Sequence, residues 1–340
     1  MLRGGIVGTA FGESRMGMVG EGGRAKLVAI AGRNEEKTKA LAARFGCDPV
    51  IGYEALVARD DVDVVGVYTS TDLHAGIAIA AARAGKHVIV TKPTTVAVAE
   101  GEAMLAAARA AGVRLVVEFN TRYEPASYRI YRAIAEGRLG SLIQGDYKNM
   151  CLRGQAYYDE GNRWRALPEK GGGCLQNQGT HAIDHLVWYQ GPVEGVVAMA
   201  GTFTHDIPAE DAASALVRFR NGSIATLSVT TTFPSGLAAG RYGGGGTLKR
   251  AQVHGSEGSA IVEGNAVVGW VVPEGEPKVA VPETPPATVF EDLALALADP
   301  SRPEHTLVAD EHALETVYVA AALRRSAATG RYVAIDELKG

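Results

Sequence analysis

The stretch Gly5-Ile6-Val7-Gly8-Thr9-Ala10-Phe11-Gly12-Glu13 lies near the start of the chain and decides its fold. Its apolar first half predicts a short buried strand, and the glycines that follow predict a tight turn. At the end of the first strand of a βαβ series, such a turn lets the backbone approach a pyrophosphate. The full G-x-G-x-x-G pattern needs glycine at positions 8, 10 and 13, where this chain has Gly8, Ala10 and Glu13. The alternative is an ordinary tight turn, and Glu13 suits an anion site only if its carboxylate points away.

The first third of the chain alternates strand and helix patterns. Apolar strand-like runs occur at 5–8, 27–31, 62–68, 87–90 and 115–117, and helix-like segments occur at 35–45, 53–58, 73–84 and 98–111. Strands that alternate with helices indicate parallel βαβ units. Residues 1–122 are therefore predicted to form a doubly wound parallel sheet, the Rossmann arrangement that binds dinucleotides.

The pattern changes after residue 122. We expect helices at 125–135 and 180–189, and strands at 142–150, 212–219 and 223–231. Long strands separated by glycine turns indicate an open, mostly antiparallel sheet with helices on one face. Residues 123–340 are thus predicted to be a second α/β domain for substrate binding and oligomerisation. Its terminal helices, near 290–298 and 307–329, could pack back on the first domain, and the glycine run at 243–246 predicts a mobile loop.

Composition narrows the class of protein. The chain has 340 residues, of which 46% are hydrophobic, enough for two domains. Its 34 basic and 38 acidic residues give a net charge of −4, which argues against nucleic acid as a partner. No apolar run is long enough for a membrane span, and no signal peptide is expected at Met1. Cys47, Cys151 and Cys174 are sparse and suggest reduced thiols, so we expect a cytoplasmic protein.

A second glycine turn opens the stretch from Gly171 to Asp184, Gly-Gly-Gly-Cys-Leu-Gln-Asn-Gln-Gly-Thr-His-Ala-Ile-Asp. Asn177 and His181 are four residues apart, so on one α-helix they would share a face. An imidazole beside a hydrogen-bonding amide suits the removal of an alcohol proton. His181 could instead be a core histidine. His181 and His185 are also spaced like ligands on a metal helix, but no third ligand motif accompanies them, and no metal is predicted.

Two basic residues stand at the predicted carboxyl ends of strands. Arg33 and Asn34 follow the second strand, where NAD sites usually carry an acidic residue for the ribose and an arginine can hold a 2′-phosphate. An arginine at position 33 favours NADP(H) as the cofactor, and NAD(H) stays possible. The alternative interpretation is that Arg33 is a solvated residue on a loop. Lys92 precedes Pro93 at the end of the fourth predicted strand, where it would face the cofactor, or would be a surface lysine beside a turn.

Several motifs occur in a fixed order along nearly the whole chain: the first glycine turn, Thr69-Ser70-Thr71-Asp72-Leu73-His74, Ala84 to Val88 leading to Lys92-Pro93, Phe119 to Ala126, Gly171 to Asp184, and Ala327 to Arg331. In this order they resemble the glucose–fructose oxidoreductase / inositol dehydrogenase / MocA (Gfo/Idh/MocA) family. The resemblance implies a Rossmann domain followed by an α/β domain with an open, mostly antiparallel sheet. It also implies an NAD(P)-dependent dehydrogenase or reductase of sugars, cyclitols or polyols, which is a homodimer or homotetramer through the outer face of that sheet.

The resemblance assigns roles to particular residues. Lys92 matches the lysine of the family's Glu-Lys-Pro motif, where Thr91 replaces Glu, and would polarise the substrate oxygen. His181 matches the histidine of the Asp-x-x-x-His motif and would be the acid/base. Asn177 stands in place of the Asp, so it can orient but cannot titrate.

The remaining predicted ligands follow the same motifs. The cofactor set comprises Gly8, Thr9, Ala10, Phe11, Gly12, Arg33, Asn34, Thr69, Ser70, Thr71, His74, Lys92 and Asn120. The substrate set comprises Arg122, Tyr123, Trp164 and Asp184. For each of these four a structural role is the alternative: a hinge for Arg122 and Tyr123, packing for Trp164, and a helix brace for Asp184. Arg163 and Arg165, beside Trp164, either face a carboxylate or sugar ring or are solvated, and Tyr157 and Tyr158 either stack on the substrate or pack.

Three functions therefore remain open at this stage. The first is an oxidoreductase that moves a hydride between nicotinamide and a secondary alcohol or ketone of a sugar-like substrate. The second is a non-catalytic NADP-binding sensor or assembly protein, which the departures at Thr91 and Asn177 allow. The third is a metal-dependent hydrolase or lyase built on His181 and His185.

Overall fold

The computed structural model describes residues 1–234, 236, 246–274, 279, 281–299 and 312–339. Within it the chain forms two compact units. Unit 1 comprises Met1–Tyr123 and Pro286–Leu314, and unit 2 comprises Glu124–Pro285 and Glu315–Gly340. The predicted glycine loop at 243–246 and the start of the predicted helix at 307 lie mostly outside the described residues.

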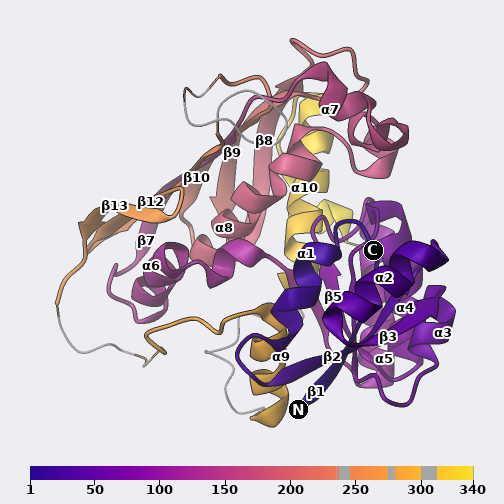
Figure 1. Ribbon diagram of the computed structural model, residues 1–340. Helices are drawn as coiled ribbons and strands as arrows, with labels where there is room; N and C mark the ends of the chain where they lie inside the picture. Colours follow the sequence, from indigo (N-terminus) through magenta and orange to yellow (C-terminus); the bar gives the residue numbers. More distant parts are fainter. Residues whose placement is uncertain (235, 237–245, 275–278, 280, 300–311, 340) are drawn as a thin grey trace. The chain divides into compact units, whose positions relative to one another are not determined.

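Unit 1 contains a six-stranded parallel sheet (Figure 1). Its strands are β1 (Leu2–Val7), β2 (Ala25–Gly32), β3 (Asp48–Ile51), β4 (Val64–Val67), β5 (His87–Thr91) and β6 (Leu115–Glu118). They lie in the order β3-β2-β1-β4-β5-β6, which is the order of dinucleotide-binding sheets. Because the strand order reverses between β1 and β4, the carboxyl ends of these two strands mark the expected ligand position. The predicted Rossmann domain is confirmed.

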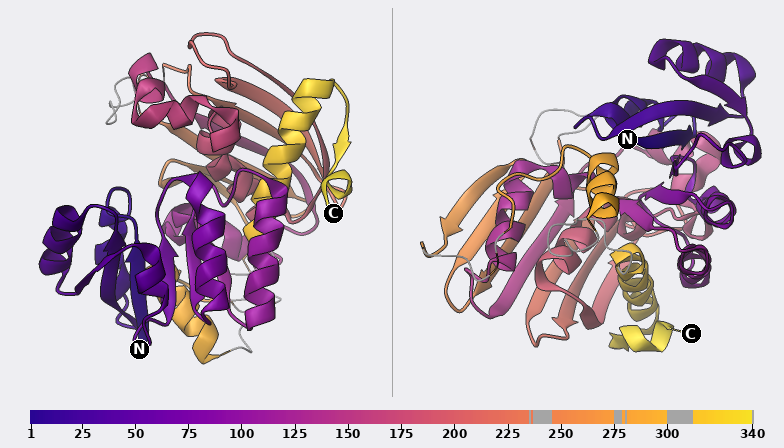
Figure 2. Two further views of the ribbon diagram at one scale, coloured as in Figure 1. Left: turned by 90° about the vertical axis from the view of Figure 1, so that its right-hand side faces the viewer. Right: turned by 90° about the horizontal axis from the view of Figure 1, so that it is seen from below.

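The helices of unit 1 begin and end at recognisable signals. They are α1 (Glu13–Met16), α2 (Glu35–Phe45), α3 (Tyr53–Val57), α4 (His74–Arg83), α5 (Val98–Ala111) and α9 (Val289–Ala298). Asn34 caps α2 by accepting from the Lys37 amide, and Gly46 and Gly112 end α2 and α5 in the left-handed conformation. α4 and α5 pack side by side (Figure 2).

α9 completes the core of unit 1 from far along the chain. Its Phe290 and Leu293 are almost wholly buried in one cluster with Ile6 and Tyr68. The Tyr123 hydroxyl donates a hydrogen bond to Asp292 Oδ2 at 3.1 Å, which ties α9 to the end of the first segment. Burial is the main reason that the pKa of Tyr123 lies well above its usual value. Unit 1 therefore needs residues that follow strands β7 to β13 of unit 2 in the sequence.

Unit 2 is built on an eight-stranded mixed sheet. Its strands are β7 (Leu142–Met150), β8 (Val193–Gly201), β9 (Ala212–Phe219), β10 (Ile224–Thr230), β11 (Leu248–Gly255), β12 (Ser259–Glu263), β13 (Ala266–Val271) and β14 (Val333–Ala334). They lie in the order β13-β12-β11-β7-β10-β9-β8-β14. The pair β7 and β10 is parallel and the other described pairs are antiparallel, so the predicted mostly antiparallel sheet is confirmed.

Helices cover one face of this sheet (Figures 1 and 2). The helices of unit 2 are α6 (Pro125–Ala135), α7 (Gln155–Asp159), α8 (Thr180–Gln190) and, from Glu315 on, α10 (His312–Thr329). α8 packs on β7, β10 and β11, over the buried Tyr147, Leu227 and Val253. The opposite face exposes Met199 and Leu216, at 80% and 63% of their surface.

Candidate functional site

The first glycine turn requires glycine for steric reasons. Gly8 has φ +117°, and a Cβ on it would lie 2.3 Å from the Tyr68 carbonyl oxygen. A Cβ on Gly12 would lie 2.2 Å from the Gly8 carbonyl oxygen. The turn therefore sits against the end of β4 at the point where the strand order reverses, with Thr9, Ala10 and Phe11 at least partly exposed. A bare backbone at this position fits the diphosphate of a dinucleotide.

Glu13 points away from the turn. Its Oε1 lies 2.7 Å from Arg44 Nη1 on α2, so the carboxylate is paired with a neighbouring helix. An anion site at this turn requires that the Glu13 carboxylate point away from it. Because Arg44 pairs with that carboxylate, Glu13 presents no unpaired negative charge at the turn.

Arg33 and Asn34 differ in what their side chains can do. Arg33 is exposed directly after β2, where its guanidinium is open to a ligand. The Asn34 side chain accepts from the Lys37 amide at 2.8 Å and so is used to begin α2. Of this predicted pair, only Asn34 has a side chain that caps α2.

The ends of β4 and β5 are held together by His74. This side chain is 1% exposed, and its Nδ1 lies 3.0 Å from the Pro93 carbonyl oxygen while Nε2 lies 3.2 Å from that of Thr69. Burial lowers the pKa of His74, although the three backbone carbonyls oppose that shift. His74 thus braces the segments on which Thr69 and the half-buried Lys92 lie.

The other predicted residues around β4 and β6 vary in exposure. Ser70 is exposed, Thr69 and Asn120 are half-buried, and Thr71 is buried. Arg122 is 2% exposed and lies over the Phe119 ring at 5.3 Å. Arg122 and Tyr123 therefore both have contacts within unit 1.

The second glycine turn leads into a π-helical turn, Cys174–Gln178, before α8 begins at Thr180. The Gly179 amide donates to the Cys174 carbonyl five residues back. Asn177 therefore lies in the π-turn and His181 in the first turn of α8, so the two residues are not on one regular α-helix. Glycine is required here as well: Gly173 has φ +89°, and a Cβ on Gly172 would lie 2.4 Å from the Arg165 carbonyl oxygen.

Tyr157 connects Asn177 to the loop before the glycine turn. Its hydroxyl oxygen accepts from Asn177 Nδ2 at 2.9 Å and from Gln178 Nε2 at 2.7 Å. The Arg165 guanidinium lies 4.7 Å from the Tyr157 ring centre and 4.8 Å from that of Trp164. The sequence carries no signal for this arrangement, because α7, residues 161–166 and the π-turn meet only in the folded unit.

Asp184 and His185 lie inside unit 2. Asp184 is fully buried, and His185 is 7% exposed and stacks on Tyr189 at 5.3 Å. Their burial favours the role of helix brace for Asp184 and of core residue for His185. Among the described residues, no group of three histidine, cysteine or carboxylate side chains is arranged to hold a metal ion.

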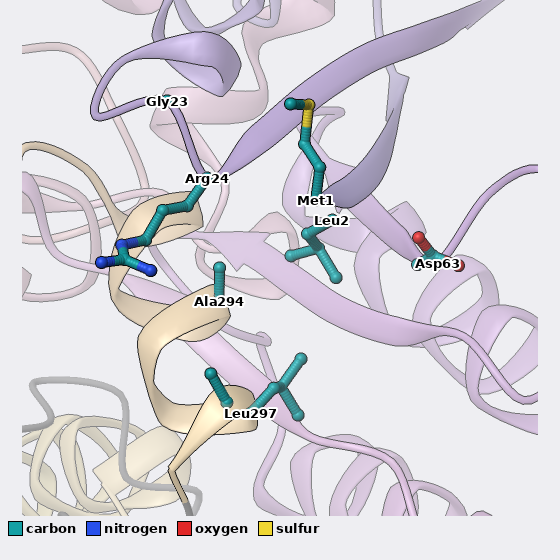
Figure 3. Close-up of a pocket in the computed structure, with 8 residues that line it drawn as sticks. Met1, Leu2, Gly23, Arg24, Asp63, Ala294 and Leu297 are labelled. Atoms are coloured by element: carbon teal, nitrogen blue, oxygen red, sulfur yellow. The ribbon is translucent and has the colours of Figure 1, made fainter.

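A hollow of about 460 Å³ lies elsewhere on unit 1, between the start of β1 and α9 (Figure 3). Leu2 and Asp63 line it at the amino ends of β1 and β4, with Leu297 of α9 opposite. Ligands of such sheets bind at the carboxyl ends. The hollow is therefore separate from the nucleotide position.

Comparison with known proteins agrees with this geometry. Residues 2–119 match the model of an oxidoreductase family with an NAD-binding Rossmann fold, and residues 128–261 match the GFO/IDH/MocA C-terminal domain. The chain is 32% identical over 247 residues to 1,5-anhydro-D-fructose reductase of Ensifer adhaerens, covering 69% of this chain and 68% of the relative. It is 28% identical over 267 residues to levoglucosan dehydrogenase of Pseudarthrobacter phenanthrenivorans, covering 68% of this chain and 63% of the relative.

A solved structure gives the same result over almost the whole chain. The WlbA dehydrogenase from Bordetella pertussis, in complex with NADH and UDP-GlcNAcA, superposes with a TM-score of 0.82 at 28% identity, covering 98% of each chain. Fold and matches together define an NAD(P)-dependent oxidoreductase that acts on CH–OH groups. The chain belongs to the Gfo/Idh/MocA family. None of its described helices is both long and apolar enough to cross a membrane.

Proposed function

We propose that the protein transfers a hydride between nicotinamide and a secondary alcohol or ketone of a sugar, cyclitol or related polyol. The observation that carries the proposal is that this family scaffold keeps a half-buried, protonatable side chain at both motif positions. These are Lys92 at the end of β5 and His181 in the first turn of α8. A bound nicotinamide would supply the hydride acceptor or donor.

The chain's own residues would handle the proton and the charge. His181 takes the hydroxyl proton in oxidation and returns it in reduction, since an imidazole titrates near neutral pH. Lys92 donates a hydrogen bond to the same oxygen and stabilises its developing negative charge. Asn177 is held by Tyr157 and orients the hydroxyl without titrating.

The relatives support a sugar-like substrate. Those named above are a reductase of an anhydro-sugar and a dehydrogenase of levoglucosan, and the solved WlbA dehydrogenase holds a nucleotide-linked sugar. The compounds named for these relatives are all polar ring molecules with hydroxyl groups. We propose a substrate of this class for the present chain, and not any one of these compounds.

Replacing His181 tests the mechanism. We expect His181→Ala to lower kcat by about 100-fold or more while leaving NADPH affinity unchanged, because only proton transfer is lost. The measurement is NAD(P)H formation and consumption with a panel of sugars, cyclitols and keto-sugars, beside cofactor titration by fluorescence. His254→Ala, which alters another half-buried histidine of unit 2 on β11, is the control. Equal turnover in wild type and His181→Ala would remove His181 from the mechanism, and cofactor binding without turnover of any substrate would favour the sensor function.

We further propose NADP(H) as the preferred cofactor. The support is Arg33, which is exposed directly after β2 at the position where a 2′-phosphate would need a cation. NAD(H) lacks that phosphate and would gain nothing from this guanidinium.

A homodimer or homotetramer through the uncovered face of the second sheet is also proposed. Val197 pairs with Leu216 across β8 and β9, and Met199 and Ile224 lie on the same face. Their exposure ranges from 39% for Val197 to 80% for Met199. Contiguous exposed apolar side chains favour burial against another copy. Light scattering of the wild type and Leu216→Glu tests this, and a monomeric wild type would refute it.

A further inference from the structure

The Arg153–Tyr157–Arg165 cluster of unit 2 places two guanidinium groups at one aromatic ring. Both guanidiniums lie against the Tyr157 ring, at 5.6 Å for Arg153 and 4.7 Å for Arg165. Glu160 pairs with Arg165: its Oε2 is 3.9 Å from Arg165 Nη1, and its side chain is 57% exposed. Such a long, solvated pair neutralises little charge.

Arg153 is the less satisfied of the two arginines. Its Nη1 donates to the Leu152 carbonyl oxygen at 2.8 Å. Within the described part of the chain it makes no ion pair, and its Nε is buried without a hydrogen-bond acceptor. A buried donor on a cation without an acceptor is costly, so an anionic ligand that accepted from it would gain that free energy.

The cluster is held in place before any ligand arrives. The Arg153 amide donates to the Thr231 carbonyl at 2.9 Å, and the Arg153 carbonyl oxygen lies 2.8 Å from His205 Nε2. The face of Tyr157 supports both guanidinium groups. Groups fixed in this way lose little conformational entropy when they bind a ligand.

The cluster is also connected to the proposed catalytic turn. The Tyr157 hydroxyl, at the far end of the ring from its own backbone, accepts from Asn177. Arg153 and Arg165 lie at the Tyr157 ring, and the Asn177 amide donates to its hydroxyl. A group that can bind an anion therefore lies next to the residue that would orient the reacting alcohol. Planar guanidinium groups bind carboxylates and phosphates through paired hydrogen bonds.

We propose that the substrate carries an anionic group, a ring carboxylate or an ester phosphate, which Arg153 and Arg165 bind while His181 acts on a hydroxyl of the same molecule. This inference rests on the proposed function and specifies its substrate class. Arg153 and Arg165 are then specificity residues, and a neutral sugar of the same ring would bind more weakly.

The test compares matched sugars with and without the charge. D-Glucuronate and D-galacturonate are set against D-glucose and D-galactose, and glucose 6-phosphate distinguishes phosphate from carboxylate. Calorimetry on the full chain saturated with NADPH measures binding, and turnover is followed with both cofactors. We expect at least one anionic sugar to bind about 10- to 100-fold more tightly than its neutral partner.

Variants then assign the effect to the arginines. Arg153→Gln and Arg165→Gln should each weaken anionic-sugar binding about 10- to 100-fold, with a small change for neutral sugars. Arg163→Gln is the matched control, because Arg163 donates to the Asp206 carbonyl and faces Asp159, and not the Tyr157 ring. Arg153→Lys should recover part of the affinity, which separates loss of charge from misfolding.

The inference and the proposed function fail in different ways. If no anionic sugar binds better than its neutral partner, or if both glutamine variants bind it like wild type, the anionic substrate is refuted. Should neutral sugars then still be oxidised in a His181-dependent way, the proposed function stands alone. Anion binding that depends on Arg153 without oxidation of any sugar would keep the site and refute the hydride transfer.

Discussion

At the scale of single residues, Arg33 carries the choice of cofactor. We expect Arg33→Ala to lower kcat/KM for NADPH about 10-fold or more and to leave the value for NADH nearly unchanged, because only a 2′-phosphate loses a charged hydrogen bond. Lys37→Ala removes another exposed cation from the start of α2 and serves as the control. Equal losses with the two cofactors would show that Arg33 does not discriminate between them.

Asp211 gives the fold a dependence on pH. Burial alone would raise its pKa, but the amides of Thr204 and Phe203 and the His205 imidazole outweigh burial and lower it. A carboxyl with a lowered pKa in the folded state stabilises the fold above its unfolded value, about 3.9, and this contribution is lost as the pH falls through the folded pKa.

Asp211→Asn should therefore remove that contribution. We expect a loss of about 1–3 kcal/mol in the free energy of unfolding at pH 7 and a flatter decline with acid below about pH 4. Urea unfolding at a series of pH values measures both quantities. A variant whose stability declines with acid as steeply as that of wild type would contradict this assignment.

Other residues show what a sequence can and cannot reveal. Glycine patterns predicted both turns, since a Cβ on Gly8 or Gly12 would overlap backbone atoms and Gly173 has a positive φ. The partners of Tyr157 could not be predicted, because Asn177 and Arg165 reach it only through tertiary contacts. Motif position alone also placed His74 among the ligands, although its ring nitrogens are used by backbone carbonyls.

At the scale of elements, the first glycine turn of the Rossmann unit tolerates little change. We expect Gly8→Ala to abolish measurable cofactor binding and to cost about 1–3 kcal/mol of stability, because φ is +117° and the new methyl group would overlap Tyr68. Gly76→Ala on α4, where a Cβ meets open space, should be neutral or stabilising. Normal cofactor affinity in Gly8→Ala would show that the turn does not contact the dinucleotide.

Elements with strong periodicity were predicted to the residue. The helices at 35–45, 98–111 and 125–135 and the strands at 142–150 and 212–219 have the predicted bounds. β3 was missed because it is four residues long and contains Pro49, which gives no strand signal. The π-turn was missed because its pattern of apolar residues does not differ from that of a short α-helix.

At the scale of the whole molecule, cofactor binding should stabilise the fold by mass action. When its free concentration is about 100 times its Kd, NADPH would add about 2.7 kcal/mol to the free energy of unfolding, because it binds only the folded protein. We expect a rise in Tm that is larger with NADPH than with NADH at equal concentration. Differential scanning calorimetry measures this, and equal shifts would contradict the proposed preference.

The place of α9 has a consequence for synthesis of the protein. Strands β1 to β6 leave the ribosome within the first 118 residues, but Phe290 and Leu293, which fill the space beside Ile6 and Tyr68, are made much later. Until then the nascent sheet exposes apolar side chains on one side, and chaperones that recognise apolar surface could bind there. A fragment cut after Tyr123 would lack the side chains that cover this surface, so we expect it to be less stable than unit 1 in the full chain.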